Sequence, residues 1–156
     1  MQITTQLSGS RIIFYIILII IISSGLKLYT VDFSIPPHSD DFGYIIDSTQ
    51  YSQGDFFLNP RKNPGWSLVL SPFMAIINSD NFLDYTTLAK ILGIAISTIT
   101  IVPMYLLARR FFDEKYSLVA SCLFAFEPHL NINSVFGLSE PIFILAIILS
   151  TIFILQ

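Results

Sequence analysis

The length of the apolar segments limits the fold more than any other feature of this sequence. An uninterrupted apolar stretch from Ile12 to Ile22 opens a longer segment that reaches Tyr29. A helix needs about 20 mainly apolar residues to cross the hydrocarbon core of a bilayer. Three later segments are similar, and the predicted spans are about residues 12–29, 86–108, 116–135 and 141–156. The predicted fold is therefore all-α: one membrane domain, a polytopic transmembrane helical bundle of about four spans.

The composition points the same way and excludes several classes of function. Hydrophobic residues make up 53% of the chain and charged residues 12%, whereas about 25% of a soluble domain is charged. The net charge is -3 and the basic residues form no stripe, so nucleic acid is not an expected partner. The single cysteine, Cys122, excludes an intrachain disulfide and CxxC chemistry.

The first apolar segment has two interpretations. Its apolar run is followed by Ser23, Ser24 and Gly25, and an apolar run followed by small residues is typical of a cleavable signal peptide. The later segments also need insertion, and a retained anchor serves that purpose equally well. We therefore favour a membrane span, with Lys27 near its outer end able to extend toward the interface.

The region from residue 30 to residue 84 is predicted to be a long external loop, because acids, amides and prolines interrupt its apolar pattern. Ile45–Gln53 could form a short helix. Trp66–Asn78 is apolar, but it is short and contains Pro72, which disfavours a full span. We expect this second piece to lie along the external interface, with Trp66 as its anchor.

Basic residues in short loops predict the orientation. Arg11 precedes the first segment, and Arg109–Lys115 forms a tight polar turn between two later segments. Short basic loops stay cytoplasmic, so both should be inside and the long loop outside. This orientation places the following polar residues on one external side: Asp40, Asp41, Lys90 and Glu140.

Each of these residues also has a purely structural interpretation. Adjacent carboxylates such as Asp40 and Asp41 could supply a general base or bind a cation, but Ser39-Asp40-Asp41 is also a good helix start. Lys90 lies about one turn inside its segment, as an interfacial anchor or as a ligand for an anionic headgroup. Glu140 before a proline suits a helix start. Glu127 and His129 lie on either side of Pro128, which breaks their helix. We interpret them as part of a structural kink in preference to catalytic residues.

The order of short motifs along residues 11–156 resembles a known family. The motifs are as follows: Ser39-Asp40-Asp41-Phe42-Gly43-Tyr44, Gln53-Gly54-Asp55-Phe56, Lys62-Asn63-Pro64-Gly65-Trp66, Leu88-Ala89-Lys90-Ile91-Leu92-Gly93, Tyr105-Leu106-Leu107-Ala108-Arg109-Arg110-Phe111-Phe112 and Leu138-Ser139-Glu140-Pro141. This order resembles the N-terminal part of GT-C class glycosyltransferases, in the group of protein O-mannosyltransferases and aminoarabinose lipid A transferases. The chain stops within an apolar segment at Gln156, so we expect the N-terminal fragment of a larger GT-C fold, inactive alone.

The resemblance implies a reaction and roles for individual residues. Members of the group transfer a sugar from a polyprenyl-phosphate carrier on the external or luminal side of a membrane. Asp40 and Asp41 match the catalytic acids of their first external loop. Lys90 matches a basic residue that holds the carrier phosphate, and Glu140 matches an acid-proline turn; Lys62 is a further expected substrate-binding residue. The family often has Glu at position 41, Arg at position 90, and Lys or His at position 63, which puts individual roles in doubt.

The predicted function is therefore that of a multi-pass glycosyltransferase of the cell membrane. Its expected partners are membrane lipid, a polyprenyl-phosphate-linked sugar and a protein or glycolipid acceptor. The sequence requires no cofactor, although a divalent cation could bridge carboxylate and phosphate; a metal site is not assigned. The alternative is a small non-enzymatic multi-pass membrane subunit, in which the loop acids are simply solvated.

Overall fold

The computed structural model describes residues 9–37, 39–56, 64–77 and 79–155, and over these residues the chain is all-α, without strands. The helices in chain order are α1 (Gly9–Thr30), α2 (Ser39–Ser52), α3 (Pro64–Ile77), α4 (Phe82–Ile99), α5 (Ile101–Ala108), α6 (Glu114–Ala125), α7 (Pro128–Phe136) and α8 (Glu140–Ile154). The predicted all-α class is confirmed.

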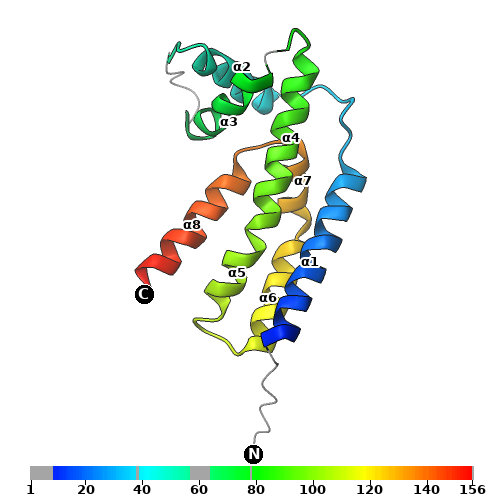
Figure 1. Ribbon diagram of the computed structural model, residues 1–156, viewed down its shortest axis with the longest axis vertical. Helices are drawn as coiled ribbons and strands as arrows, with labels where there is room; N and C mark the ends of the chain where they lie inside the picture. The colour runs from blue at the N-terminus through cyan, green and yellow to red at the C-terminus, as the bar shows by residue number, and fades with distance from the viewer. Residues whose placement is uncertain (1–8, 38, 57–63, 78, 156) are drawn as a thin grey trace, which may run out of the picture.

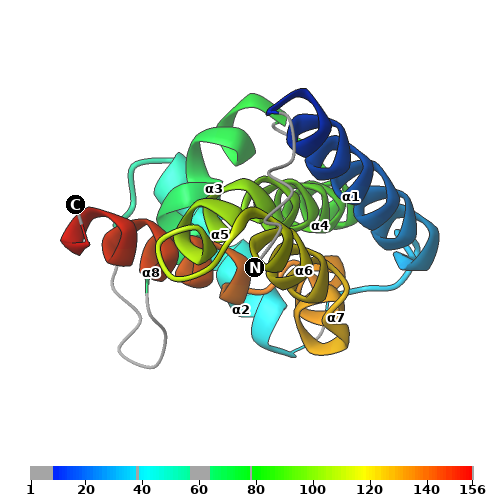
Figure 2. The same cartoon turned by 90° about the horizontal axis from the view of Figure 1, so that it is seen from below.

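The long helices form a bundle that is closed at one end by the two short helices of the first loop. In Figure 1, α1 leads toward the end occupied by α2 and α3, α4 and α5 run back, α6 and α7 return, and α8 runs back again. Figure 2 shows α1 and α8 on opposite sides of α4 and α5. The helix α3 stays beside α2 at this end and does not run along the bundle.

Two helical segments of the described chain are long and apolar enough to cross a membrane: Gly9–Thr30 and Phe82–Ala108. Length and composition alone do not separate such helices from a soluble core helix or from a signal sequence. Of the other two predicted spans, 116–135 is divided into α6 and α7, and 141–156 corresponds to α8, which has 15 residues. A count of four spans stays a prediction.

The packing of α1 is the reverse of that in a soluble protein. Its buried residues are Ser23 and Lys27, whereas large apolar side chains such as Ile13, Phe14 and Ile21 are each 61% exposed. In water, burial of apolar surface drives folding, and polar residues mostly stay outside. The predicted extension of Lys27 toward an interface is wrong, because its side chain is buried against the bundle.

Other helices repeat this pattern. The buried residues of α6 are Ser117, Ser121 and Ala125, and those of α7 are Asn133 and Ser134. Helix interfaces in membranes are enriched in small and polar residues, which allow close approach and hydrogen bonds between helices. α1, α6 and α7 therefore meet their neighbours mainly through small or polar residues and leave large apolar side chains outside.

The third predicted span is broken near its middle. α6 ends at Ala125, and Glu127 caps α7 by accepting a hydrogen bond from the Leu130 amide through Oε2 at 2.6 Å. The Ala125 carbonyl oxygen accepts hydrogen bonds from Ser23 Oγ (3.1 Å) and Asn131 Nδ2 (3.3 Å). The break that the sequence predicts at Pro128 is present, and Glu127 has a structural role as the cap of α7.

Two glycines allow α4 to approach α7 and the turn after it. A Cβ atom added at Gly93 would lie 2.7 Å from the Ser134 carbonyl oxygen. Gly137 ends α7 with a φ of 77°, a left-handed conformation that glycine adopts readily. A Cβ atom there would lie 3.1 Å from the Ala89 carbonyl carbon and 3.2 Å from the Lys90 nitrogen. The turn before α8 is thus held directly against α4 beside Lys90.

The predicted role of Trp66 as an interfacial anchor is wrong. Trp66 is 2% exposed, and its indole Nε1 donates a hydrogen bond to the Gly137 carbonyl oxygen at 2.8 Å. It belongs to an apolar cluster that joins α2, α3 and α4: Ile45, Trp66, Leu70, Met74 and Ala89. A buried indole needs a partner for its N–H, and the turn after α7 supplies it. The two short helices are therefore anchored by packing on the bundle.

Candidate functional site

The first turn of α2 carries the two candidate acids. The helix begins at Ser39, as the helix-start interpretation predicts, and Asp40 and Asp41 fall in its first turn, where the helix dipole favours negative charge. The two side chains differ in environment: Asp40 is exposed, whereas Asp41 is 1% exposed. Only Asp40 is therefore open to a molecule arriving from outside the bundle.

Lys90 is buried and binds the connection between α1 and α2. The residue is 2% exposed, and its ammonium donates hydrogen bonds to the carbonyl oxygens of Asp32 (2.8 Å) and Ile35 (2.9 Å). The carboxylates of Asp32 and Asp41 are close enough to interact electrostatically with it. The Lys90 ammonium binds the protein backbone, which is a structural contact, and its roles as an interfacial anchor or headgroup ligand stay predictions. Asp41 and Lys90, predicted to share one side of the membrane, lie at the same end of the bundle.

A small turn stiffens the connection that Lys90 holds. Asp32 Oδ1 accepts hydrogen bonds from the Ser34 amide (2.8 Å) and the Ser34 hydroxyl (2.6 Å). These bonds, the hydroxyl first, lower the pKa of the Asp32 carboxyl from its usual value because they stabilise the charged form. Asp32 therefore remains a carboxylate, and its negative charge complements the Lys90 ammonium.

Glu140 begins α8 at the same end of the bundle. The preceding residue links this turn to α2, because Ser139 Oγ donates a hydrogen bond to the Tyr44 hydroxyl at 3.5 Å. Within the described residues, Glu140 Oε2 is buried and has no hydrogen-bond partner. The structure therefore places Glu140 at the predicted end, but it shows no contact between Glu140 and Lys90.

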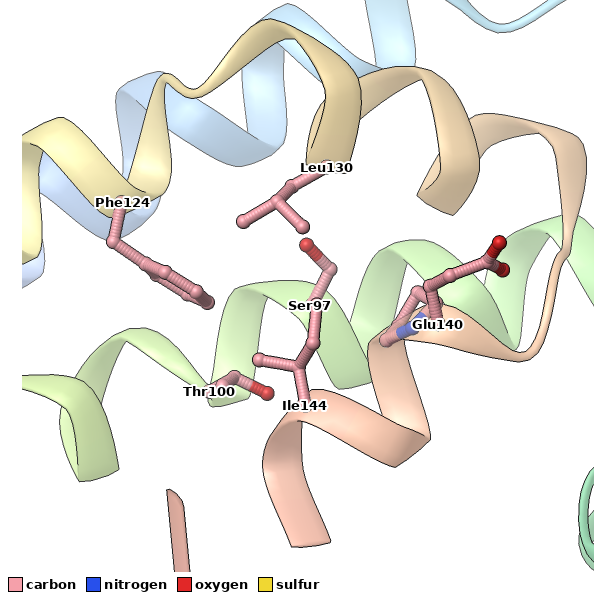
Figure 3. Close-up of a pocket in the computed structure, with 7 residues that line it drawn as sticks. Ser97, Thr100, Phe124, Leu130, Glu140 and Ile144 are labelled. Carbon is pink, nitrogen blue, oxygen red and sulfur yellow. The ribbon is translucent and has the colours of Figure 1, made fainter. Parts of the chain in front are cut away.

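A narrow cavity of about 10 Å³ lies between α4 and α8, with α6 and α7 on its other side. Its lining residues are Ser97, Thr100, Phe124, Leu130, Glu140, Pro141 and Ile144. Figure 3 shows the Glu140 carboxylate pointing away from Ser97 and Thr100. Apolar side chains and the small hydroxyl groups of Ser97 and Thr100 thus line the interior of this cavity, and the Glu140 carboxylate lies at its margin.

Lys27 is a buried charged residue that sequence reasoning missed. It is 1% exposed, and its Nζ donates a hydrogen bond to Ser97 Oγ at 2.8 Å. The same seam contains a weaker contact from Ser24 Oγ to Thr98 Oγ1 at 3.5 Å. A signal existed in the sequence, because Ser23 and Lys27 are four residues apart and so share one face of a helix. That stripe marks the face of α1 that meets the bundle.

The predicted substrate-binding role of Lys62 and the predicted divalent cation both stay predictions. Lys62, the further expected substrate-binding residue, lies outside the described residues. Within the described part of the chain, no three side chains of His, Cys, Asp or Glu are grouped so that they could hold a metal ion. A divalent cation is therefore not assigned to any set of ligands.

Comparisons with known proteins give no match: no family model, curated protein or solved structure is similar to this chain at a significant level. The chain's own residues and their geometry are therefore the basis for assigning a function. They provide an exposed acid, a buried acid and a buried ammonium at one end of a bundle whose outer surface is apolar.

Proposed function

We propose that the chain is a multi-pass membrane protein whose α2–α3 end faces outside. The supporting observation is the reversed packing of the helices, with Ser, Thr, Gly and Ala in the seams and large apolar side chains outside. The start of α1, with Arg11, and the turn between α5 and α6, with Arg109, lie together at the opposite end (Figure 1). Basic residues favour the cytoplasmic side, which gives the orientation.

Cysteine labelling tests this orientation. In a Cys122→Ser background, Asp55→Cys at the α2–α3 end should react with a membrane-impermeant maleimide added outside intact cells. Asp113→Cys, in the turn between α5 and α6, should react only after permeabilisation. Both parent side chains are exposed, so the matched pair differs mainly in its side of the membrane. The reverse pattern would refute the orientation.

We further propose that this end transfers a sugar from a polyprenyl-phosphate carrier to an external hydroxyl acceptor, as the resemblance to GT-C enzymes implies. The observation that carries the proposal is the electrostatic contact between Asp41 of α2 and Lys90 of α4, with the exposed Asp40 next to Asp41 in the same helical turn. Asp40 accepts the proton of the acceptor hydroxyl while the new oxygen–carbon bond forms at the sugar. The bond between that carbon and the carrier phosphate breaks, and the phosphate leaves with the bonding electrons. Lys90 lies beside these acids and binds the carbonyl oxygens of Asp32 and Ile35.

An apolar groove next to this end suits a lipid-linked donor. It contains about 560 Å³ of empty space between the start of α3 and the first turns of α8. The lining residues are Gly65, Trp66, Ser139, Ile142, Phe143 and Ala146. Ser139 precedes α8, while Ile142 and Ala146 are four residues apart and share a helix face that leads away from this end. A hydrocarbon tail along this face would leave its headgroup near the acids.

Transfer is measured directly in membranes that contain the longer protein of which this chain is expected to be the N-terminal part. A radiolabelled polyprenyl-phosphate sugar is supplied with the acceptors of the native membrane, and labelled lipid and protein products are separated. We expect labelled product in excess of that in membranes lacking the chain. Equal labelling in the two preparations, with the chain present in amounts verified by immunoblot, would contradict the proposal.

A non-enzymatic membrane subunit is the second candidate. One observation favours it: the Lys90 ammonium is engaged by two backbone carbonyls, and acids in a first helical turn are common without catalysis. In this case the polar end serves only to join the short helices to the bundle. Absence of transfer, combined with the external orientation found by labelling, is the result that this candidate predicts.

A further inference from the structure

Lys90 of α4 links its own helix to the connection between α1 and α2 and to the first turn of α2. Its ammonium binds the carbonyls of Asp32 and Ile35 and interacts electrostatically with Asp41. We propose that Lys90 is a positioning residue: it fixes the connection 31–37 on α4 and thereby places the two acids of α2. The inference rests on the proposed transfer reaction and differs from the phosphate-binding role that the family resemblance implies.

The connection can transmit this restraint because it is short and stiff. The Asp32–Ser34 hydrogen bonds close a turn at its start. Pro36 and Pro37 follow Ile35 directly, and proline fixes its own φ and restricts the residue before it. Few backbone torsions therefore remain free between the Ile35 carbonyl and Pro37, where the described part of the connection ends. A carbonyl held by Lys90 thus helps to set where the first turn of α2 begins.

The other side of Lys90 provides a rigid support. Gly137 packs against the backbone of Ala89 and Lys90, and its carbonyl accepts the Trp66 indole hydrogen bond. The backbone of α4 at Lys90 is thus fixed by the turn before α8 and by α3 at the same time. An ammonium that projects from a fixed backbone can hold the connection 31–37 in one position, which a surface lysine cannot do.

Kinetics separate positioning from phosphate binding. Lys90→Met keeps the approximate length of the side chain but removes its hydrogen-bond donors. The Asp32 and Ile35 carbonyls are then no longer held, and Asp40 and Asp41 should move from their positions. We expect kcat to fall by about 100-fold, as misplaced catalytic groups commonly cause, with the KM for the polyprenyl-phosphate donor within about twofold of wild type. Lys90→Arg retains donors for two carbonyls and should restore most of kcat. A large rise in KM with kcat unchanged would show phosphate binding and overturn the proposal.

A second readout does not depend on catalysis. Ile35 is 49% exposed, and Ile35→Cys leaves the backbone carbonyl that Lys90 binds. A spin label at this position, in the Cys122→Ser background, should become more mobile in Lys90→Met and regain its restraint in Lys90→Arg. A label at Phe111, which is 63% exposed at the opposite end, serves as the control and should not change.

The label results decide the inference even if no transfer is found. Unchanged mobility at position 35 in Lys90→Met would overturn it. Equal loosening at positions 35 and 111 would also overturn it, because Lys90 would then support the whole bundle. Pro36→Gly provides a second approach that leaves Lys90 intact: it should raise mobility at position 35 and lower kcat without changing the donor KM. No effect of Pro36→Gly on mobility would contradict the proposed transmission.

Discussion

Asp40→Asn should lower sugar transfer by about 100-fold or more, because an amide cannot accept the acceptor's proton and general base catalysis commonly contributes that much. The change keeps the size of the side chain and its suitability for a first helical turn. Expression and thermal stability should therefore stay near wild type. Initial rates with a polyprenyl-phosphate donor, normalised to protein in the membrane, measure the effect.

Two further variants make this test specific. Asp41→Asn should reduce transfer less than Asp40→Asn, since Asp41 is buried and cannot meet the acceptor directly. Asp80→Asn, an exposed acid just before α4, is the matched control and should not change the rate. If the acids only start a helix, Asp40→Asn costs about 0.3–1 kcal/mol of helix stability and leaves transfer intact. Wild-type turnover by Asp40→Asn would remove the catalytic assignment.

Gly93→Ala should destabilise the bundle by about 1–3 kcal/mol, which is the usual cost of overpacking a tight interface. The added Cβ atom would lie 2.7 Å from the Ser134 carbonyl oxygen, and this oxygen belongs to a helical backbone that cannot move alone. α4 and α7 would have to separate, and the contact of Gly137 with Ala89 and Lys90 would open with them. Thermal unfolding in detergent, followed by tryptophan fluorescence of the buried Trp66, should show a lower midpoint.

Gly25→Ala provides the matched control for this prediction. Gly25 is also inside a helix, but nothing lies within 4 Å of a Cβ atom added there. Alanine is about 1 kcal/mol better than glycine in a helix interior, so this variant should unfold at or above the wild-type temperature. A Gly93→Ala protein as stable as Gly25→Ala would contradict the close packing of α4 on α7.

The sequence was sufficient to predict the helices, because apolar run length and helix starts are local properties. The first span, predicted at 12–29, corresponds to α1, and the span predicted at 86–108 corresponds to α4 and α5. The helix start at Ser39 also follows from local chemistry. The predicted loop 30–84 contains the short helices, although α2 begins earlier than Ile45.

The contacts of particular side chains could not be predicted from the sequence. Trp66 in an apolar segment fits an interface as well as a core, and only the position of the Gly137 carbonyl decides between them. Lys90 fits an anchor, a ligand or a structural contact, and its role depends on where residues 32 and 35 fold, more than 50 positions away. Such choices depend on tertiary geometry, which residue type and spacing do not contain.

The break between α6 and α7 has a consequence for the order of biogenesis. A backbone carbonyl within the hydrocarbon core must have a hydrogen-bond partner, because no water is available there. At the break, the Ala125 carbonyl obtains one partner locally from Asn131 and the other from Ser23 of α1. α1 leaves the ribosome first, so under the proposed membrane topology its hydroxyl is in the bilayer before the third segment enters. α1 is thus expected to supply a hydrogen bond that the break between α6 and α7 needs as it folds.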